Sequence, residues 1–80
     1  MKYSVYVLQD DKGDLYKGMT SNLRSRLRQH KNKHTKTTAK MKKLFVAHVE
    51  EFDTFDDARK RELYLKSAAG RRFLKKKLGH

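Results

Sequence analysis

Five side chains in this 80-residue sequence are of types that together could hydrolyse a phosphodiester: Tyr6, Tyr16, Arg26, His30 and Glu62. A carboxylate can hold one divalent cation, which polarises a phosphate and stabilises the leaving oxygen. An arginine fork can bind a non-bridging phosphate oxygen and offset the charge that develops in the transition state. A tyrosine or histidine could help to deprotonate the attacking water if a metal or nearby cations lowered its pKa.

Each of these residues also has a purely structural interpretation. Tyr6 and Tyr16 could be half-buried aromatic residues of strands, and His30 could complement the dipole at the end of a helix. Arg26 and Glu62 could form an internal salt bridge with each other, an alternative to which the sequence gives about equal weight.

The two tyrosines are expected on the two strands of a hairpin. Residues 2–9 are rich in β-branched and aromatic residues, the turn D-D-K-G follows, and residues 14–18 form a second short strand. If Gly13 is a bulge in a three-residue loop, Tyr6 and Tyr16 project from the same face. A register slip of one residue would separate them.

Arg26 and His30 are expected on one helix, which begins after the capping segment 20–22 and runs to about residue 30 or 31. Leu23, Arg26, Leu27 and His30 follow the spacing of a single helical stripe. A purely structural helix would carry apolar residues at all four positions. Arg26 and His30 therefore depart from the pattern of a simple core-facing helix.

The second half of the chain predicts a strand over residues 44–52 and two helices. Along that strand, Phe45 and Val49 should lie on one side and Val46 and His48 on the other. The first of the two helices starts at Thr54, which forms a capping pair with Asp57.

The inward stripe of that helix contains Phe55, Ala58, Glu62 and Leu65. A carboxylate at the Glu62 position carries a desolvation cost unless it is paired or binds a cation. Gly70 is expected to end the helix in the left-handed conformation. A short basic helix follows, whose Phe73, Leu74 and Leu78 would dock it on the core.

The charge of the chain indicates a nucleic-acid partner rather than a merely solvated basic surface. The net charge is +12, from 21 basic and 9 acidic side chains, and no acidic residue lies between Tyr16 and Val49. Clustered Lys and Arg bind phosphate backbones by releasing counterions. The candidate contacts are Lys17, Arg24, Lys31, Lys43, Arg71, Arg72, Lys75 and Lys76.

Composition also limits the class of protein. The chain has no Cys, so neither a disulfide framework nor a thiolate zinc site can form, and the spacing of its His, Asp and Glu residues suggests no zinc site with several protein ligands. Neither a membrane span nor a signal peptide is recognisable. We expect one cytoplasmic domain over residues 1–80, without a membrane partner or a small-molecule cofactor, and most simply a monomer.

The order of these residues resembles the GIY-YIG nuclease domain over essentially the whole chain. Residues 4–6 (S-V-Y) stand for Gly-Ile-Tyr, and residues 16–18 (Y-K-G) stand for Tyr-Ile-Gly. Arg26 and His30 match the family's helix arginine and the histidine that follows it. The segment D-D-A-R-K-R-E-L-Y-L-K is similar to the one that carries the family's metal-binding glutamate, here Glu62. The resemblance is strongest to the small standalone bacterial members, and the N-terminal nuclease domain of the bacterial excinuclease is also similar.

The resemblance implies an α/β domain of the α+β type, with a three-stranded antiparallel sheet flanked by about three helices. It also implies one Mg²⁺ or Mn²⁺ at Glu62, Arg26 on the phosphate, and Tyr6 and Tyr16 around the attacking water. Ser4 and Lys17 depart from the two half-motifs, and no equivalent of the late Asn of some members is found. Strand alternation should direct Lys17 away from the tyrosines, where it adds a phosphate contact.

Three functions are compatible with the sequence, and the first is our leading hypothesis. It is a metal-dependent endonuclease that acts on DNA, in repair or processing, with DNA favoured over RNA. The second is a non-catalytic DNA- or RNA-binding module with the same fold. The third is an interaction protein whose basic surface meets an acidic protein partner, which charge alone supports.

Overall fold

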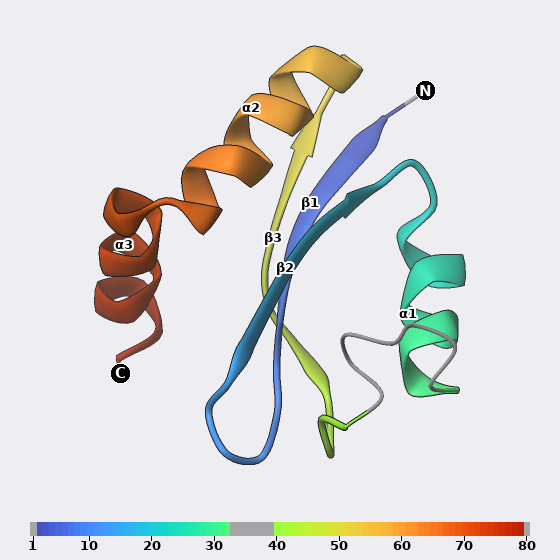
Figure 1. Ribbon diagram of the computed structural model, residues 1–80. Helices are drawn as coiled ribbons and strands as arrows, with labels where there is room; N and C mark the ends of the chain where they lie inside the picture. Colours follow the sequence, from blue (N-terminus) through green and yellow to red (C-terminus); the bar gives the residue numbers. More distant parts are fainter. Residues whose placement is uncertain (1, 33–39, 80) are drawn as a thin grey trace.

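Three strands form one antiparallel sheet, and helices cover both of its faces (Figure 1). The computed structural model describes residues 2–32 and 40–79. The sheet has the order β2-β1-β3, so β1 is central. The elements are β1 (Tyr3–Gln9), β2 (Leu15–Thr20), α1 (Leu23–Lys31), β3 (Phe45–Phe52), α2 (Phe55–Lys66) and α3 (Ala68–Leu78). The predicted fold class is confirmed.

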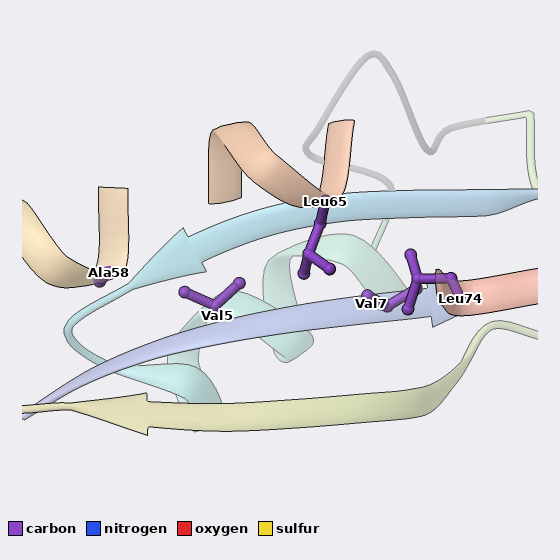
Figure 2. Close-up of a cluster of buried hydrophobic side chains, with 5 residues drawn as sticks. All are labelled: Val5, Val7, Ala58, Leu65 and Leu74. Carbon is purple, nitrogen blue, oxygen red and sulfur yellow. The ribbon is translucent and has the colours of Figure 1, made fainter. Parts of the chain in front are cut away.

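The hydrophobic core lies between β1 and the two C-terminal helices. Figure 2 shows Val5 and Val7 of β1 directed toward Ala58 and Leu65 of α2 and Leu74 of α3. All five side chains are fully buried. Burying one Val or Leu side chain contributes about 1.5–3 kcal/mol, so this cluster anchors α2 and α3 on one face of the sheet. The opposite face carries the alternate residues of β1, and α1 lies on that side (Figure 1).

The hairpin has the predicted parity. Tyr6 is paired with Gly18 and Leu8 with Tyr16, so Tyr6, Leu8 and Tyr16 share a face. Gly13 has a φ of 89°, in the left-handed region that favours glycine. The Asp10 carboxylate accepts hydrogen bonds from the backbone N–H groups of Lys12 and Asp14, which closes the turn.

Strand β3 departs from the predicted alternation because it contains a β-bulge. Val7 is paired with His48 but Leu8 with Val46, so Ala47 has no partner of its own. The extra residue reverses the alternation between the two sheet faces for the residues of β3 that precede it. Val46, the partner of Leu8, and Val49, the partner of Tyr6, therefore lie on the same face of the sheet. The prediction that placed them on different faces is wrong.

The predicted cap of α2 is confirmed, but two other expectations for the C-terminal half are wrong. The Thr54 hydroxyl accepts from the Asp57 N–H at 3.2 Å. Phe55 is 54% exposed and makes an edge contact with Tyr3 rather than entering the core. Gly70 does not end α2: the helix stops at Lys66, and Ser67 both ends it and caps α3.

Gly70 is a helical residue at a close approach of two backbones. A Cβ at this position would lie 2.0 Å from the Tyr64 carbonyl oxygen and 2.4 Å from the Leu65 Cα. Glycine is needed here so that the first turn of α3 can pack against the end of α2. As predicted, Leu74 of α3 is buried and Lys75, Lys76 and Lys77 are exposed. In the described part of the chain, no helix has the length and apolar character that a membrane span requires.

Candidate active site

A hydrogen-bonded chain of three side chains crosses the face of the sheet that α1 covers. Tyr6 is fully buried, and its hydroxyl lies 2.9 Å from Nε2 of His30. Nε of Arg26 donates to the same hydroxyl at 3.4 Å. Both partners come from the predicted stripe of α1, on which Leu23, Arg26, Leu27 and His30 are less exposed than their neighbours.

The Tyr6 hydroxyl takes part in both hydrogen bonds of this chain. The Arg26 Nε–H can only donate, so the Tyr6 oxygen accepts from it, and the same hydroxyl shares a second hydrogen bond with Nε2 of His30. In the tautomer of the neutral imidazole that carries its proton on Nδ1, Nε2 of His30 accepts this bond and the Tyr6 hydroxyl donates it. The arrangement is a relay that runs from the guanidinium through the phenol to the imidazole.

The pKa shifts of the two titratable members favour this neutral arrangement. Burial raises the pKa of Tyr6 above its ordinary value of 10.0, and the hydrogen bond from Arg26 offsets burial only in part. Burial, with the charge of Arg26, lowers the pKa of His30 below 6.5. At neutral pH Tyr6 is therefore a phenol and His30 a neutral base. His30, rather than Tyr6, has the lowered pKa that the sequence analysis required of a base.

Tyr16 completes an aromatic wall around His30. The ring centroids of Tyr6 and Tyr16 lie 6.2 Å apart, and those of Tyr16 and His30 lie 4.9 Å apart in an edge arrangement. Gly18 makes room for the wall: a Cβ there would lie 2.7 Å from the Tyr6 hydroxyl oxygen and 3.1 Å from Cε1 of Tyr16. The glycine of the second half-motif is thus required by the tyrosine of the first.

Arg26 is held in place by its own helix. Asn22 caps α1 by accepting from the Ser25 N–H at 3.1 Å. One turn further, Nη1 of Arg26 donates to the side-chain oxygen of Gln29 at 2.9 Å. Besides Gln29, the guanidinium has Tyr6 and Tyr16 as hydrogen-bond partners, both of which raise the pKa of Arg26. Gln29 was not among the predicted site residues, although its i, i+3 spacing from Arg26 signals such a contact.

Glu62 stands apart from the other four predicted residues. It lies on α2, whose Ala58 and Leu65 pack on the Val5 and Val7 face, opposite the tyrosines. Its side chain is 8% exposed, and its oxygens pair with Arg59 at 2.9 Å and Lys66 at 3.4 Å. The predicted alternative of a salt bridge with Arg26 is therefore wrong: cations of its own helix compensate Glu62.

A carboxylate has the chemistry of a ligand for a divalent cation, but in this structure both oxygens of Glu62 are engaged by cations of its own helix. A carboxylate oxygen is the ligand that Mg²⁺ and Mn²⁺ prefer, and Mg²⁺ commonly keeps several waters beside one or two carboxylates. The described residues contain no group of three His, Cys, Asp or Glu side chains that could hold a metal.

The predicted nucleic-acid contacts lie on both sides of the sheet. Arg24, Lys31 and Lys43 are exposed on or near α1, whereas Arg71, Arg72, Lys75 and Lys76 are exposed on α3. Lys17 is paired with Val7 and points away from the tyrosines, as alternation predicted. Burial, and then the charges of Arg71 and Lys66, lower the pKa of Lys17.

A further polar cluster lies on the core face, where the sequence analysis assigned no role to His48. Nε2 of His48 lies 2.7 Å from Glu50, and Nε of Arg61 lies 3.0 Å from the same carboxylate. Burial would raise the pKa of Glu50, but the hydrogen bonds with His48 and Arg61 outweigh it and hold the pKa below 4.5. Arg61 also lies over the rings of Tyr64 and Phe73. The cluster ties β3 to α2 and α3; the i, i+2 spacing of His48 and Glu50 on one strand face was its sequence signal.

Comparison with known proteins agrees with this fold. The family model described as the GIY-YIG catalytic domain matches residues 2–77, so the chain belongs to the GIY-YIG family. Among solved structures it is similar to the UPF0213 protein BH0048 from Bacillus halodurans, determined by solution NMR. That likeness has a TM-score of 0.58 at 25% identity and covers 92% of this chain and 82% of the other.

A curated relative matches over a shorter stretch. It is named the UPF0213 protein in VLF1-GP41 intergenic region, from Autographa californica nuclear polyhedrosis virus, and is 55% identical over 31 residues. The aligned part is 39% of this chain and 30% of the viral protein. The match thus spans less than a third of that relative's length.

Proposed function

We propose that this protein is a metal-dependent endonuclease that hydrolyses phosphodiester bonds in DNA. The observation that carries the proposal is the hydrogen-bonded chain from Arg26 through Tyr6 to His30, in a member of a nuclease-type family. A buried phenol between a guanidinium and a neutral imidazole is suited to moving a proton beside a phosphate. The net charge of +12 favours a polyanionic substrate.

In the proposed reaction the scissile phosphate lies at the β2 edge of the sheet. This edge separates the tyrosine face from α2, which packs against β2 as well as β1. The donors of Arg26 that Tyr6 and Gln29 leave available bind a non-bridging oxygen. Glu62 would hold the divalent cation, which when bound supplies charge stabilisation to the phosphate and the leaving oxygen.

The relay accounts for the proton of the attacking water. As the water oxygen bonds to phosphorus, one of its protons passes to the Tyr6 oxygen while the Tyr6 proton passes to Nε2 of His30. The P–O bond to the leaving group breaks, and that oxygen takes a proton from solvent. Tyr16 packs against His30 and keeps its ring in line with Tyr6.

A nicking assay on supercoiled plasmid tests the proposal. Wild type is compared with Glu62→Ala in Mg²⁺, Mn²⁺ and EDTA, each protein being checked for folding by circular dichroism. We expect metal-dependent nicking that Glu62→Ala abolishes while a gel-shift assay still detects DNA binding. Equal nicking by wild type and Glu62→Ala at matched purity would refute the role of Glu62.

Arg26→Ala and Lys76→Ala form a matched pair of cation removals. Arg26→Ala should slow the chemical step far more, because Lys76 is exposed on α3 and would make only screened backbone contacts. Equal effects of the two substitutions on the rate at saturating DNA would show that Arg26 contributes charge alone.

A second function is a non-catalytic DNA- or RNA-binding module. The observation that favours it is the pairing of both Glu62 oxygens with Arg59 and Lys66, which leaves the carboxylate compensated without a metal. A module of this kind would bind DNA with a steep salt dependence, be indifferent to Mg²⁺, and lose nothing on Glu62→Ala. The same plasmid assay separates the two functions.

A further inference from the structure

Gln29 of α1 is an exposed residue whose side chain contacts the arginine of the candidate active site. Nη1 of Arg26 lies 2.9 Å from the side-chain oxygen of Gln29. A guanidinium nitrogen can only donate, so the atom of the amide that faces Arg26 must be the oxygen. This contact assigns the other branch of the amide as Nε2, which carries two N–H donors.

The N–H donors of Gln29 are available to a ligand. Within the described part of the chain, the amide oxygen accepts from Arg26, and Nε2 has no hydrogen-bond partner. The partners of Arg26 are Tyr6, Tyr16 and Gln29, which are fewer than the five N–H donors of a guanidinium. Two side chains in contact with each other therefore both offer N–H donors to solvent.

Gln29 lies on the side of α1 that is away from β3. Successive residues of an α-helix are about 100° apart, so Gln29 and Lys31 lie on opposite sides of the buried His30. Lys31 lines the cavity between α1 and β3, and Gln29 does not. Arg26, to which Gln29 is bonded, has Tyr16 of β2 as a partner. Gln29 thus lies toward the β2 edge, where the proposed reaction has its phosphate.

We propose that Gln29 is a second phosphate-binding residue of the candidate active site. Arg26 donates to one non-bridging oxygen of a phosphodiester, and Nε2 of Gln29 donates to the other. The inference rests on the proposed function, which supplies the nucleic-acid strand as the ligand. Because the bond from Arg26 already holds the Gln29 side chain, little side-chain entropy is lost when the phosphate binds.

Gln29→Glu separates phosphate binding from mere support of Arg26. A carboxylate at this position keeps an acceptor for the guanidinium, but it has no N–H donor and repels a phosphate. If Gln29 only supported Arg26, this variant would lose no more affinity than a negative charge placed elsewhere at the same end of α1. If Gln29 binds the phosphate, the variant loses more than that, and more than Gln29→Ala, which removes the donors without adding charge.

Asn32→Asp is the matched control for charge. Asn32 is exposed at the C-terminal cap of α1, so the substitution adds the same negative charge to the same end of the helix. In the described part of the chain, no hydrogen bond joins its side chain to Arg26. Both variants change the net charge of +12 by one, so their long-range attraction to DNA falls equally.

The experiment measures binding of a short fluorescein-labelled DNA duplex by anisotropy in EDTA, where no cleavage occurs. Gln29→Glu should bind about 10- to 150-fold more weakly than Asn32→Asp, which corresponds to one hydrogen bond to a charged group. Gln29→Ala should lie between them. In a ¹H–¹⁵N NMR titration of wild type with the unlabelled duplex, the side-chain amide signals of Gln29 should shift saturably while those of Asn32 stay in place.

Two outcomes would overturn the proposal: equal binding by Gln29→Glu and Asn32→Asp, or Gln29 amide signals that do not move while DNA binds. Because the NMR titration uses wild type, a variant that fails to fold cannot hide the result. Wild type that binds DNA through Gln29 but does not nick plasmid would refute the proposed function and leave this inference standing. Metal-dependent nicking together with a Gln29→Glu protein that behaves like Asn32→Asp would do the opposite, and failure of wild type to bind DNA would overturn both.

Discussion

Gly18→Ala is the substitution for which the structure makes its sharpest prediction. The added Cβ would lie 2.7 Å from the Tyr6 hydroxyl oxygen, 2.8 Å from its Cζ and 3.1 Å from Cε1 of Tyr16. The φ of Gly18 is not in the left-handed region, so the backbone accepts an alanine and the side-chain contact alone produces the effect. Ordinary contacts begin at 3.4 Å, so the hydroxyl must retreat by about 0.7 Å, which is 3.4 minus 2.7.

A retreat of this size breaks the geometry of the relay. Tyr6 is fully buried and its hydroxyl is held at 2.9 Å from His30 and 3.4 Å from Arg26, so the phenol cannot move without lengthening one of these contacts. Misplacing a reacting group by about 1 Å can cost about 100-fold in rate. We expect the single-turnover nicking rate to fall about 10- to 100-fold while DNA binding changes little.

The stability cost should be moderate and separable from the loss of rate. Overpacking a filled site typically costs about 1–3 kcal/mol, which lowers Tm by roughly 4–8 °C per kcal/mol in a domain of this size. Gly70→Ala is the control, because its Cβ would meet backbone atoms at 2.0–2.4 Å in the α2–α3 junction, away from the tyrosines. It should reduce stability more than Gly18→Ala but leave the rate per folded molecule unchanged. A Gly18→Ala protein with the wild-type nicking rate would refute the relay geometry.

The remaining predictions concern the base, the guanidinium and the core-face cluster. The nicking rate should fall as pH drops through the lowered pKa of His30, below 6.5, because the protonated ring cannot accept the Tyr6 proton; a pH–rate profile with its acid limb above 6.5 would contradict this. By linkage, the unfolded state binds the His30 proton more readily, so the contribution of His30 to stability is complete above about pH 6.5 and is lost as pH falls through the folded pKa, which urea titrations of wild type and His30→Gln can test. Arg26→Lys keeps the charge but loses the fork that contacts Tyr6 and Gln29, and should lower kcat at least tenfold with a smaller change in KM; a wild-type kcat would rule out the fork. Glu50→Gln should reduce the free energy of unfolding by about 1–3 kcal/mol, measured in urea at pH 7, without affecting nicking; unchanged stability would show that the contacts of Glu50 with His48 and Arg61 contribute nothing.

The hairpin, the Arg26–His30 stripe and the cap of α2 could be predicted because each depends on neighbours in sequence. Strand parity places Tyr6 and Tyr16 together once the turn is known, and helical spacing places Arg26 beside His30. The resemblance to the GIY-YIG family extended the prediction from these local features to the whole chain. The family match over residues 2–77 confirms that resemblance.

Three features were decided only by the tertiary structure. The bulge at Ala47 is a register shift in the pairing of β3 with β1, and it placed Val46 on the same face as Val49, against the alternation of the sequence. The sequence predicted that Gly70 ends α2. In the structure Gly70 lies in α3, where the absence of a Cβ allows α2 and α3 to approach closely. The sequence left open whether Glu62 pairs with Arg26, because the face of the sheet that α2 covers depends on which apolar cluster it joins. Burial of Ala58 and Leu65 against Val5 and Val7 decided that question, since the free energy of a shared core outweighs that of one ion pair.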